Sequence, residues 1–325
     1  MALHTPLCDL LGIEHPIICA PFGPWPQVEL AAAVSEAGGL GSLGTAVRPV
    51  EALQDDWRRV RELTAKPFAI NHTRRPFDEA AFEASLDARP TVISFHIGEP
   101  MDLVDRAHAA GILWMHQVGT VDQAQQALDA GADVIIAQGW EAGGNAGEVA
   151  MSVLVPQVVD IAGATPVVAS GGIGDGRGLA AALALGAQGA NIGTRFVASV
   201  EMQTSDAWKQ AIVAADATDA VKVTFATSVM PPYTEGAYTT MTPRALRNDF
   251  IDTWNADPAG AESQSDELGA EVVAAVRSGT LEDLLPLTGQ SAGLVHEVRP
   301  AAEIVAALVR EAEDALTAAE RRTTS

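Results

Sequence analysis

One repeated unit constrains the fold of this chain more than any other feature. An alanine-rich, helix-like segment ends at a glycine, and a short apolar run follows. Four glycines occupy this position: Gly38, Gly111, Gly131 and Gly186. A glycine in the left-handed conformation can close a helix and turn the chain back toward the next strand. The repeat therefore predicts alternating helices and strands around a largely parallel sheet.

Eight apolar runs predict eight strands, and most runs are apolar throughout, as expected when both faces of a strand are covered. The expected strands are residues 15–20, 40–44, 67–71, 91–95, 112–117, 133–138, 166–170 and 188–193. Helix-like segments lie at residues 27–37, 50–64, 78–88, 101–110, 121–130, 149–161 and 176–186. This pattern indicates an α/β fold, a (β/α)8 TIM barrel. A doubly wound open sheet is the alternative, although no GxGxxG follows the first strand.

The pattern changes after the eighth strand. Residues 201–285 are helix-like, with breaks at residues 230–232 and 257–258, and are expected to form a small helical insertion over one mouth of the barrel. Residues 1–200 and 286–325 are then expected to form the barrel, with a long amphipathic helix at residues 299–320 returning to its wall.

The composition narrows the classes of partner. The chain has 325 residues and a formal net charge of −22. Such acidity disfavours nucleic acids and anionic membranes, which would be repelled. No run is long and apolar enough to cross a bilayer, and the start does not resemble a signal peptide. Dispersed histidines and two cysteines without a CxxC motif predict no metal site. We therefore expect a cytoplasmic protein that acts on small molecules, with its oligomeric state open.

Glycine-rich turns follow the last three expected strands. They are the stretch from Gln138 to Gly147, the turn Ser170-Gly171-Gly172 and the turn Gly193-Thr194. In TIM barrels, ligands bind at the C-terminal ends of the strands, and the last two loops often hold a phosphate. The turns therefore predict a phosphate site formed by backbone N–H groups and by the N-terminus of the helix near Asp175. The alternative is that the glycines only make tight turns.

Polar residues also end the middle strands, namely Asn71-His72, His96, His116-Gln117 and Gln138. Amide side chains at such positions can hydrogen-bond the edges of a flat heterocycle. Three of the seven histidines, His72, His96 and His116, fall at these ends. The clustering predicts at least one functional histidine without indicating which.

These residues and motifs resemble the nitronate monooxygenases, formerly called 2-nitropropane dioxygenases. Their superfamily includes flavin-dependent enoyl-acyl-carrier-protein reductases and NAD(P)H:quinone reductases. The motifs that carry the resemblance are Ala20-Pro21-Phe22-Gly23, Ala37-Gly38-Gly39-Leu40-Gly41, Asn71, Ser94-Phe95-His96-Ile97-Gly98, the stretch from Ala137 to Gly144, Ser170-Gly171-Gly172-Ile173, Gly193-Thr194-Arg195-Phe196 and Gly289-Gln290-Ser291-Ala292-Gly293.

The resemblance implies one FMN per chain, bound without covalent attachment. Gly171, Gly172, Gly193 and Thr194 would hold its phosphate, and Ser170, just before the first of these turns, would also contact the cofactor. Asn71, Gln117 and Gln138 would meet the flavin ring or the ribityl chain. Pro21, Phe22 and Gly23 would pack near the isoalloxazine. Gly143 and Gly144 would allow the cofactor to approach the backbone closely.

The chain departs from the family at one position. The family pattern reads Glu-Ala-Gly-Gly-His, and the resemblance assigns its histidine as the base that removes a proton next to the nitro group. This chain has Asn145 there. Asparagine has no useful proton affinity near neutral pH. We therefore expect oxidation of alkyl nitronates by O2 to a carbonyl compound and nitrite, with poor action on neutral nitroalkanes unless His96 or His72 replaces the base.

Two other functions stay open. NAD(P)H could supply the electrons for reduction of an enone, a quinone or an enoyl thioester. The chain could also be a flavin-binding protein with impaired catalysis. Trp140, Tyr233 and Tyr238 are candidates for substrate contact, with plain packing as the alternative.

Overall fold

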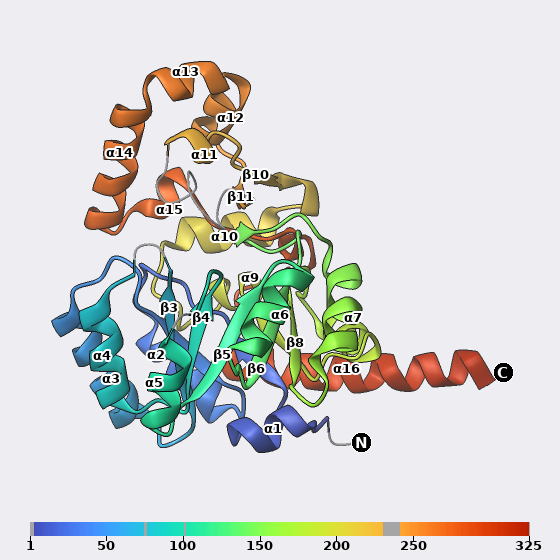
Figure 1. Ribbon diagram of the computed structural model, residues 1–325. Helices are drawn as coiled ribbons and strands as arrows, with labels where there is room; N and C mark the ends of the chain where they lie inside the picture. Colours follow the sequence, from blue (N-terminus) through green and yellow to red (C-terminus); the bar gives the residue numbers. More distant parts are fainter. Residues whose placement is uncertain (1–2, 75–76, 101, 230–240, 325) are drawn as a thin grey trace.

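The computed structural model describes residues 3–74, 77–100, 102–229 and 241–324. One parallel sheet of eight strands has the order β1-β9-β8-β6-β5-β4-β3-β2. Its strands are β1 (Ile17–Cys19), β2 (Gly41–Gly44), β3 (Phe68–Thr73), β4 (Val92–His96), β5 (Leu113–Val118), β6 (Val134–Gln138), β8 (Val167–Ser170) and β9 (Gly189–Ile192). A parallel bridge between Ile18 and Leu40 joins the outer strands. The sheet therefore closes, and the predicted TIM barrel is confirmed (Figure 1).

Helices surround the barrel at the positions that the repeat predicts. They are α2 (Val28–Glu36), α3 (Val50–Leu63), α4 (Glu79–Ala88), α5 (Leu103–Ala109), α6 (Val121–Asp129), α7 (Met151–Ala162), α8 (Gly176–Ala184) and α16 (Ala301–Thr324). The four glycines of the repeat all have positive φ, between 74° and 96°. Each therefore makes the left-handed step that turns the chain from a helix into the next strand.

The bottom of the barrel is filled by apolar side chains. Ile18, Leu40, Val92 and Met115 from the strands pack in one cluster with residues of α1 (Pro6–Leu11). Helix α1 thus covers the end of the barrel at which the strands begin (Figure 1). The ligand-binding end must be the opposite one, where the strands terminate.

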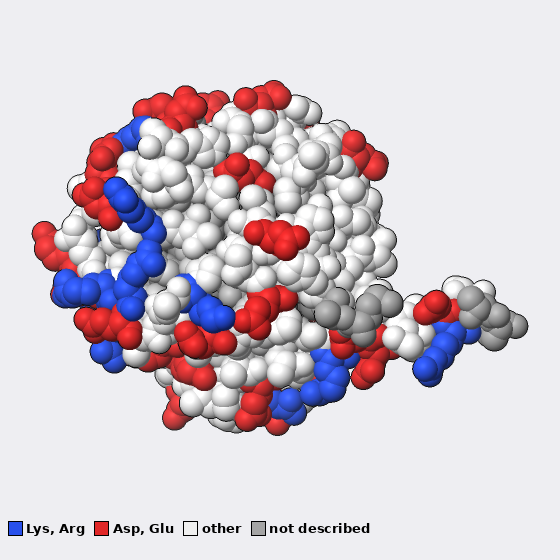
Figure 2. Space-filling view, turned by 90° about the horizontal axis from the view of Figure 1, so that it is seen from below, with Lys and Arg blue, Asp and Glu red and all other residues white. Residues whose placement is uncertain are grey.

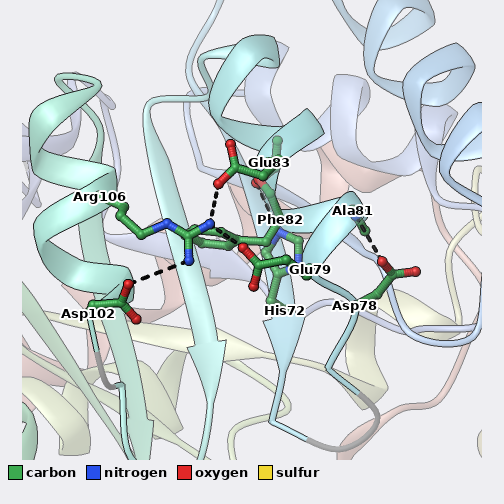
Figure 3. Close-up of polar contacts among 9 residues, drawn as sticks. His72, Asp78, Glu79, Ala81, Phe82, Glu83, Asp102 and Arg106 are labelled. Carbon is green, nitrogen blue, oxygen red and sulfur yellow. Dashed lines mark hydrogen bonds and ion pairs between the residues drawn. The ribbon is translucent and has the colours of Figure 1, made fainter.

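An arginine joins two of the outer helices. Arg106 of α5 pairs with Glu79 and Glu83 of α4 and lies 3.7 Å from Asp102 (Figure 3). Its guanidinium also packs over the ring of Phe82, 4.7 Å from the centroid. These contacts belong to the outer wall of the barrel.

Between β9 and α16 the chain forms several short elements above the barrel (Figure 1). They are α9 (Thr194–Val197), α10 (Asp206–Ala214), η1 (Ala217–Asp219), β10 (Ala220–Lys222), α11 (Ala226–Val229), β11 (Thr242–Leu246), α12 (Asp249–Ala256), α13 (Pro258–Ser263), α14 (Ser265–Ser278), α15 (Leu281–Leu284) and η3 (Gln290–Leu294). The predicted break at residues 230–232 and the candidates Tyr233 and Tyr238 lie outside the described residues.

The helical insertion expected at residues 201–285 is not helical throughout. Strands β10 and β11 lie in this stretch, and they form an antiparallel sheet with β7 (Gly144–Ala146), which follows β6 of the barrel. Three-residue and five-residue strands carry too little periodicity to be read from sequence. The pairing of β11 with β7 also joins residues about a hundred positions apart, so no local pattern could indicate it.

Figure 2 views the molecule from the end that α1 covers. Acidic and basic residues are spread along the rim of this face, and the C-terminal part of α16 projects beyond the barrel. Within the described ranges, no helix has both the length and the apolar character that a bilayer span requires.

Candidate active site

A cavity of about 300 Å³ lies where the barrel strands end. Its walls come from the loops after the strands, and its roof comes from residues 276–291 together with Trp25 and Trp208. A larger space of about 780 Å³ lies between α8, α16 and residues 294–299, and charged side chains of both signs line it. That space does not adjoin the strand ends, so the smaller cavity is the candidate active site.

Fifteen of the sixteen residues expected at the site line this one cavity. They are Pro21, Phe22, Gly23, Asn71, His96, Gln117, Gln138, Gly143, Gly144, Asn145, Ser170, Gly171, Gly172, Gly193 and Thr194. The structure thus brings together residues that lie up to 173 positions apart in the sequence. Their roles toward a ligand remain predictions.

His72 is the exception, and its expected role as a base is not supported. Its Nδ1 lies 3.2 Å from Thr45 Oγ1, and its Nε2 lies 3.0 Å from Ser85 Oγ. The ring meets Phe82 edge-on beneath α4 (Figure 3). Burial lowers the pKa of His72 to about 3. Successive side chains of a strand point to opposite faces, so Asn71 faces the cavity while His72 faces the helices.

Amide side chains form a polar layer at the base of the cavity. Asn71 Nδ2 donates to Ser94 Oγ at 2.9 Å, and Asn191 Nδ2 donates to Ser170 Oγ at 3.2 Å. Two buried amide oxygens of this layer, Gln138 Oε1 and Asn191 Oδ1, have no hydrogen-bond partner among the described residues. Buried polar atoms are rarely left unpaired, so these two oxygens mark places where a ligand can donate.

Sequence reasoning missed Asn191. It lies in the middle of the apolar strand β9 and lines the cavity. Because side chains alternate along a strand, Asn191 shares a face with position 193, which was expected at the site. A polar residue on that face of an otherwise apolar strand was the available signal.

The glycines at the site serve different purposes. A Cβ at Gly143 would lie 2.6 Å from the backbone nitrogen of Gly289, so this glycine permits close packing of two chain segments. Gly171 combines a φ of 97° with a Cβ position 3.1 Å from the backbone of Ala142. At Gly144 a Cβ would meet nothing within 4 Å, and at Gly193 only ordinary contacts at 3.5 Å and beyond. Packing therefore accounts for the first two, whereas the last two leave space inside the cavity.

The expected contribution of the helix near Asp175 is wrong. Asp175 caps α8 itself, accepting from the backbone nitrogens of Arg177 and Gly178. The nitrogen of Gly176 donates to Glu311 Oε2 at 3.0 Å. The N-terminal N–H groups of α8 are thus occupied by carboxylates of the protein, one of them from α16. An anion in the cavity would have to be bound by other groups.

His96 and Asn145 meet in the cavity. His96 ends β4 and Asn145 lies in β7, and both residues line the cavity. Burial lowers the pKa of His96 to about 4, although the backbone of Asn145 acts on that pKa in the opposite direction. The imidazole is therefore neutral at pH 7, and neither residue carries a charge there.

The described residues that line the cavity carry no formal charge near neutral pH. Of the described residues that line it, none is lysine, arginine, aspartate or glutamate. Its roof is apolar and includes Trp208, Leu281 and Leu285. Trp140, expected as a substrate contact, lies outside, where its ring packs 4.5 Å from Lys222 Nζ and 5.0 Å from the guanidinium carbon of Arg244.

Comparison with known sequences identifies relatives over most of the chain. The profile of the family described as nitronate monooxygenase matches residues 4–81 and 73–311. A nitronate monooxygenase of Paraburkholderia phytofirmans is 32% identical over 95% of this chain and 95% of its own length. A (3aS,4S,5R,7aS)-5-hydroxy-7a-methyl-1-oxo-octahydro-1H-indene-4-carboxyl-CoA dehydrogenase of Mycobacterium tuberculosis is 38% identical over 65% of this chain, and the chain spans 60% of that relative's length.

Solved structures show the same architecture. FabK from Thermotoga maritima superposes with a TM-score of 0.86 at 34% identity, covering 99% of both chains. A nitroalkane oxidase from Streptomyces ansochromogenes superposes with a TM-score of 0.79 at 28% identity, covering 96% of this chain and 99% of that one. The chain therefore belongs to the nitronate monooxygenase family.

Proposed function

We propose that this chain is an oxidoreductase that binds FMN in the cavity at the barrel mouth and oxidises alkyl nitronates. Membership of the family implies a flavin, and the cavity suits one. The unpaired oxygens of Gln138 and Asn191 match the N–H and hydroxyl donors of a flavin ring and ribityl chain. The space left at Gly144 and Gly193 would let a flat ligand approach the backbone closely.

The phosphate would be held without a cationic side chain, since none lines the cavity in the described part of the chain. Backbone N–H groups of the turns at Gly172 and Gly193 are the available donors. Thr194 adds a hydroxyl. Its Oγ1 already accepts from the nitrogen of Gly289 at 2.9 Å, so its own hydrogen is free to point toward an anion.

One observation carries the choice of nitronate as substrate: among the described residues lining the cavity, the only titratable side chain is His96, and its pKa is lowered to about 4. A general base works best when its pKa is near the working pH. His96 is thus a poor acceptor for a carbon-bound proton, and Asn145 cannot accept one. A nitronate has already lost that proton. When bound, FMN supplies the redox chemistry, with O2 as the final electron acceptor.

A second function is favoured by the shape of the roof. A neighbouring cavity of about 420 Å³ shares Pro24, Trp25, Val276 and Leu281 with the candidate site. The lining of that neighbouring cavity is mixed, with Gln203, Thr204, Ser205 and Glu282 beside the apolar residues. A space that continues beyond the polar layer gives room to a longer substrate, such as an enone or an enoyl thioester reduced at the expense of NAD(P)H. The relative from Mycobacterium tuberculosis is itself named for a carboxyl-CoA compound.

Anaerobic mixing of the purified protein with separate electron donors tests both functions. The bound flavin is first released and identified by chromatography and mass. The flavin absorbance is then followed after addition of ethylnitronate, NADH or NADPH. Rapid bleaching by ethylnitronate alone supports nitronate oxidation, whereas bleaching by a nicotinamide alone supports the reductase. A protein that binds no FMN in reconstitution contradicts the assignment of the cavity.

A further inference from the structure

Two cationic side chains lie opposite each other in the small sheet above the barrel. Lys222 of β10 pairs with Arg244 of β11, and Arg244 pairs with Gly144 of β7 on its other side. Arg244 is 2% exposed, and Lys222 is partly buried. Like charges directly opposite each other destabilise a sheet, and the burial of a cation is costly. Stability alone therefore does not explain why two cations occupy these positions.

The two cations lie on the face of this sheet that points away from the cavity. Asn145 and Pro243 are paired across β7 and β11, and both line the cavity. Successive side chains of a strand point to opposite faces. Arg244 and Lys222 therefore lie on the reverse face, behind Asn145, and neither of them lines the cavity.

The cations donate hydrogen bonds to the two ends of one short segment, residues 140–146. Arg244 Nη2 donates to the carbonyl of Trp140 at 3.0 Å. Lys222 Nζ donates to the carbonyl of Ala146 at 3.2 Å. Residues 143–145 lie between these two carbonyls and line the cavity. The part of the chain that reaches the cavity is thus held on both sides from the face behind it.

The same two side chains are also bonded within the sheet. Arg244 Nη1 donates to the carbonyl of Ala220 in β10 at 2.7 Å. Lys222 Nζ donates to the carbonyl of Thr242 in β11 at 2.9 Å. The ring of Trp140 packs against both cations, and such contacts add to the attraction. Each cation therefore joins the segment 140–146 to the strands β10 and β11.

We propose that Lys222 and Arg244 are positioning residues: they hold the two ends of the segment 140–146 against β10 and β11 and thereby fix Asn145 in the cavity. Charged donors suit this role, because their hydrogen bonds are about twice as strong as those of neutral donors. Neither side chain lines the cavity, so each acts through the segment. The kinetic consequence rests on the proposed function, whereas the structural consequence does not.

Amide hydrogen exchange, followed by mass spectrometry on the protein without substrate, tests the structural consequence. Arg244→Met and Lys222→Met keep an unbranched side chain and remove the donors. We expect each to speed exchange in the segment 140–146 about tenfold, as for one lost hydrogen bond of about 1.4 kcal/mol. A peptide that covers residues 189–197, at the end of β9, should stay within about twofold of wild type. Unchanged exchange in the segment, or equal acceleration in both peptides, would overturn the proposal.

A conservative variant separates the hydrogen bonds of Arg244 from its packing. Arg244→Lys keeps a charged donor on an unbranched stem, so we expect exchange in the segment 140–146 to fall between wild type and Arg244→Met. Equal exchange in the lysine and methionine variants would assign the effect to packing and overturn the proposal.

Arg61 of α3 offers a matched control on the outer wall of the barrel. Its guanidinium also donates to a backbone carbonyl, that of Ala88 at 3.3 Å, and also packs over an aromatic ring, that of Phe68. Arg61→Met should therefore leave exchange in the segment 140–146 unchanged. Acceleration there would show that the loss of any such cation loosens the chain, and it would count against the proposal.

A double-mutant cycle on turnover tests whether the two cations act through Asn145. Arg244→Met should lower kcat/KM about tenfold in the wild-type background and no more than about twofold in the Asn145→Ala background. Equal losses in the two backgrounds would overturn the proposed route through Asn145. If FMN binds but no electron donor supports turnover, the proposed reaction fails, and the exchange measurements still decide the role of the two cations.

Discussion

The unpaired amide oxygen of Gln138 makes the cofactor assignment testable by stability as well as by binding. A buried acceptor without a partner costs about 1–3 kcal/mol. Gln138→Met keeps the length of the side chain and removes Oε1, which has no partner in the part of the chain that the structure describes. We therefore expect the free energy of unfolding of the flavin-free variant to be no lower than that of wild type, and up to about 1–3 kcal/mol higher.

The same substitution should weaken the binding of FMN. If Gln138 Oε1 accepts a hydrogen bond from FMN, its loss leaves a ligand donor unpaired at a buried position. A cost of about 1–3 kcal/mol corresponds to a Kd that is about 5-fold to 150-fold weaker. Flavin fluorescence quenching measures Kd, and urea unfolding with and without FMN measures both stabilities.

Gln188 provides a matched control within the same chain. Its Oε1 is also buried without a partner, but Gln188 does not line the cavity. Gln188→Met should stabilise the protein similarly while leaving the Kd for FMN unchanged. The reasoning is refuted if Gln138→Met binds FMN as tightly as wild type, or if both methionine variants weaken binding equally.

Three further predictions follow from the site and its surroundings. Asn145→His restores the family base and should raise the rate of flavin reduction by nitroethane about 100-fold or more, while the rate with ethylnitronate changes little. Stopped-flow absorbance of the flavin measures both rates. Equal changes with the two compounds would contradict the prediction. Gly143→Ala puts a Cβ 2.6 Å from the backbone nitrogen of Gly289 and should cost about 1–3 kcal/mol in urea unfolding. Burial lowers the pKa of Lys222 to about 7, so between pH 7 and about 10 the unfolded state binds a proton that the folded state does not. The free energy of unfolding of wild type should therefore rise with pH across that window relative to Lys222→Met. Parallel curves of unfolding free energy against pH for the two proteins would argue against this.

The barrel could be predicted from sequence because its signals are local. Gly38, Gly111 and Gly186 each end a helix and adopt positive φ, which is decided within a few residues. The ends of parallel strands then meet at one face by topology alone. For this reason, residues as distant as Pro21 and Thr194 could be assigned to the same cavity without knowledge of any contact.

The errors arose where the outcome depends on distant partners or on the face of a strand. Glu311, 135 positions away, occupies the end of α8 that was expected to bind a phosphate. Strand β11 pairs with β7 across about a hundred residues, and no local pattern indicates such a strand. His72 lies at the strand end that the sequence indicates, but its side chain faces the helices rather than the cavity. Asn191 shares the face of position 193, and its polar side chain in an apolar strand is the only local sign of its role.

Comparison of ethylnitronate with nitroethane decides whether the cavity oxidises nitronates without a base, because the two compounds differ only by the proton that the cavity is expected to be unable to remove. FMN-loaded protein at pH 7 is mixed anaerobically with each compound, and the rate of flavin bleaching is measured. The account predicts rapid bleaching by ethylnitronate and bleaching by nitroethane at least about 100-fold slower. Comparable rates with both would show that the cavity contains an effective base and would contradict the account.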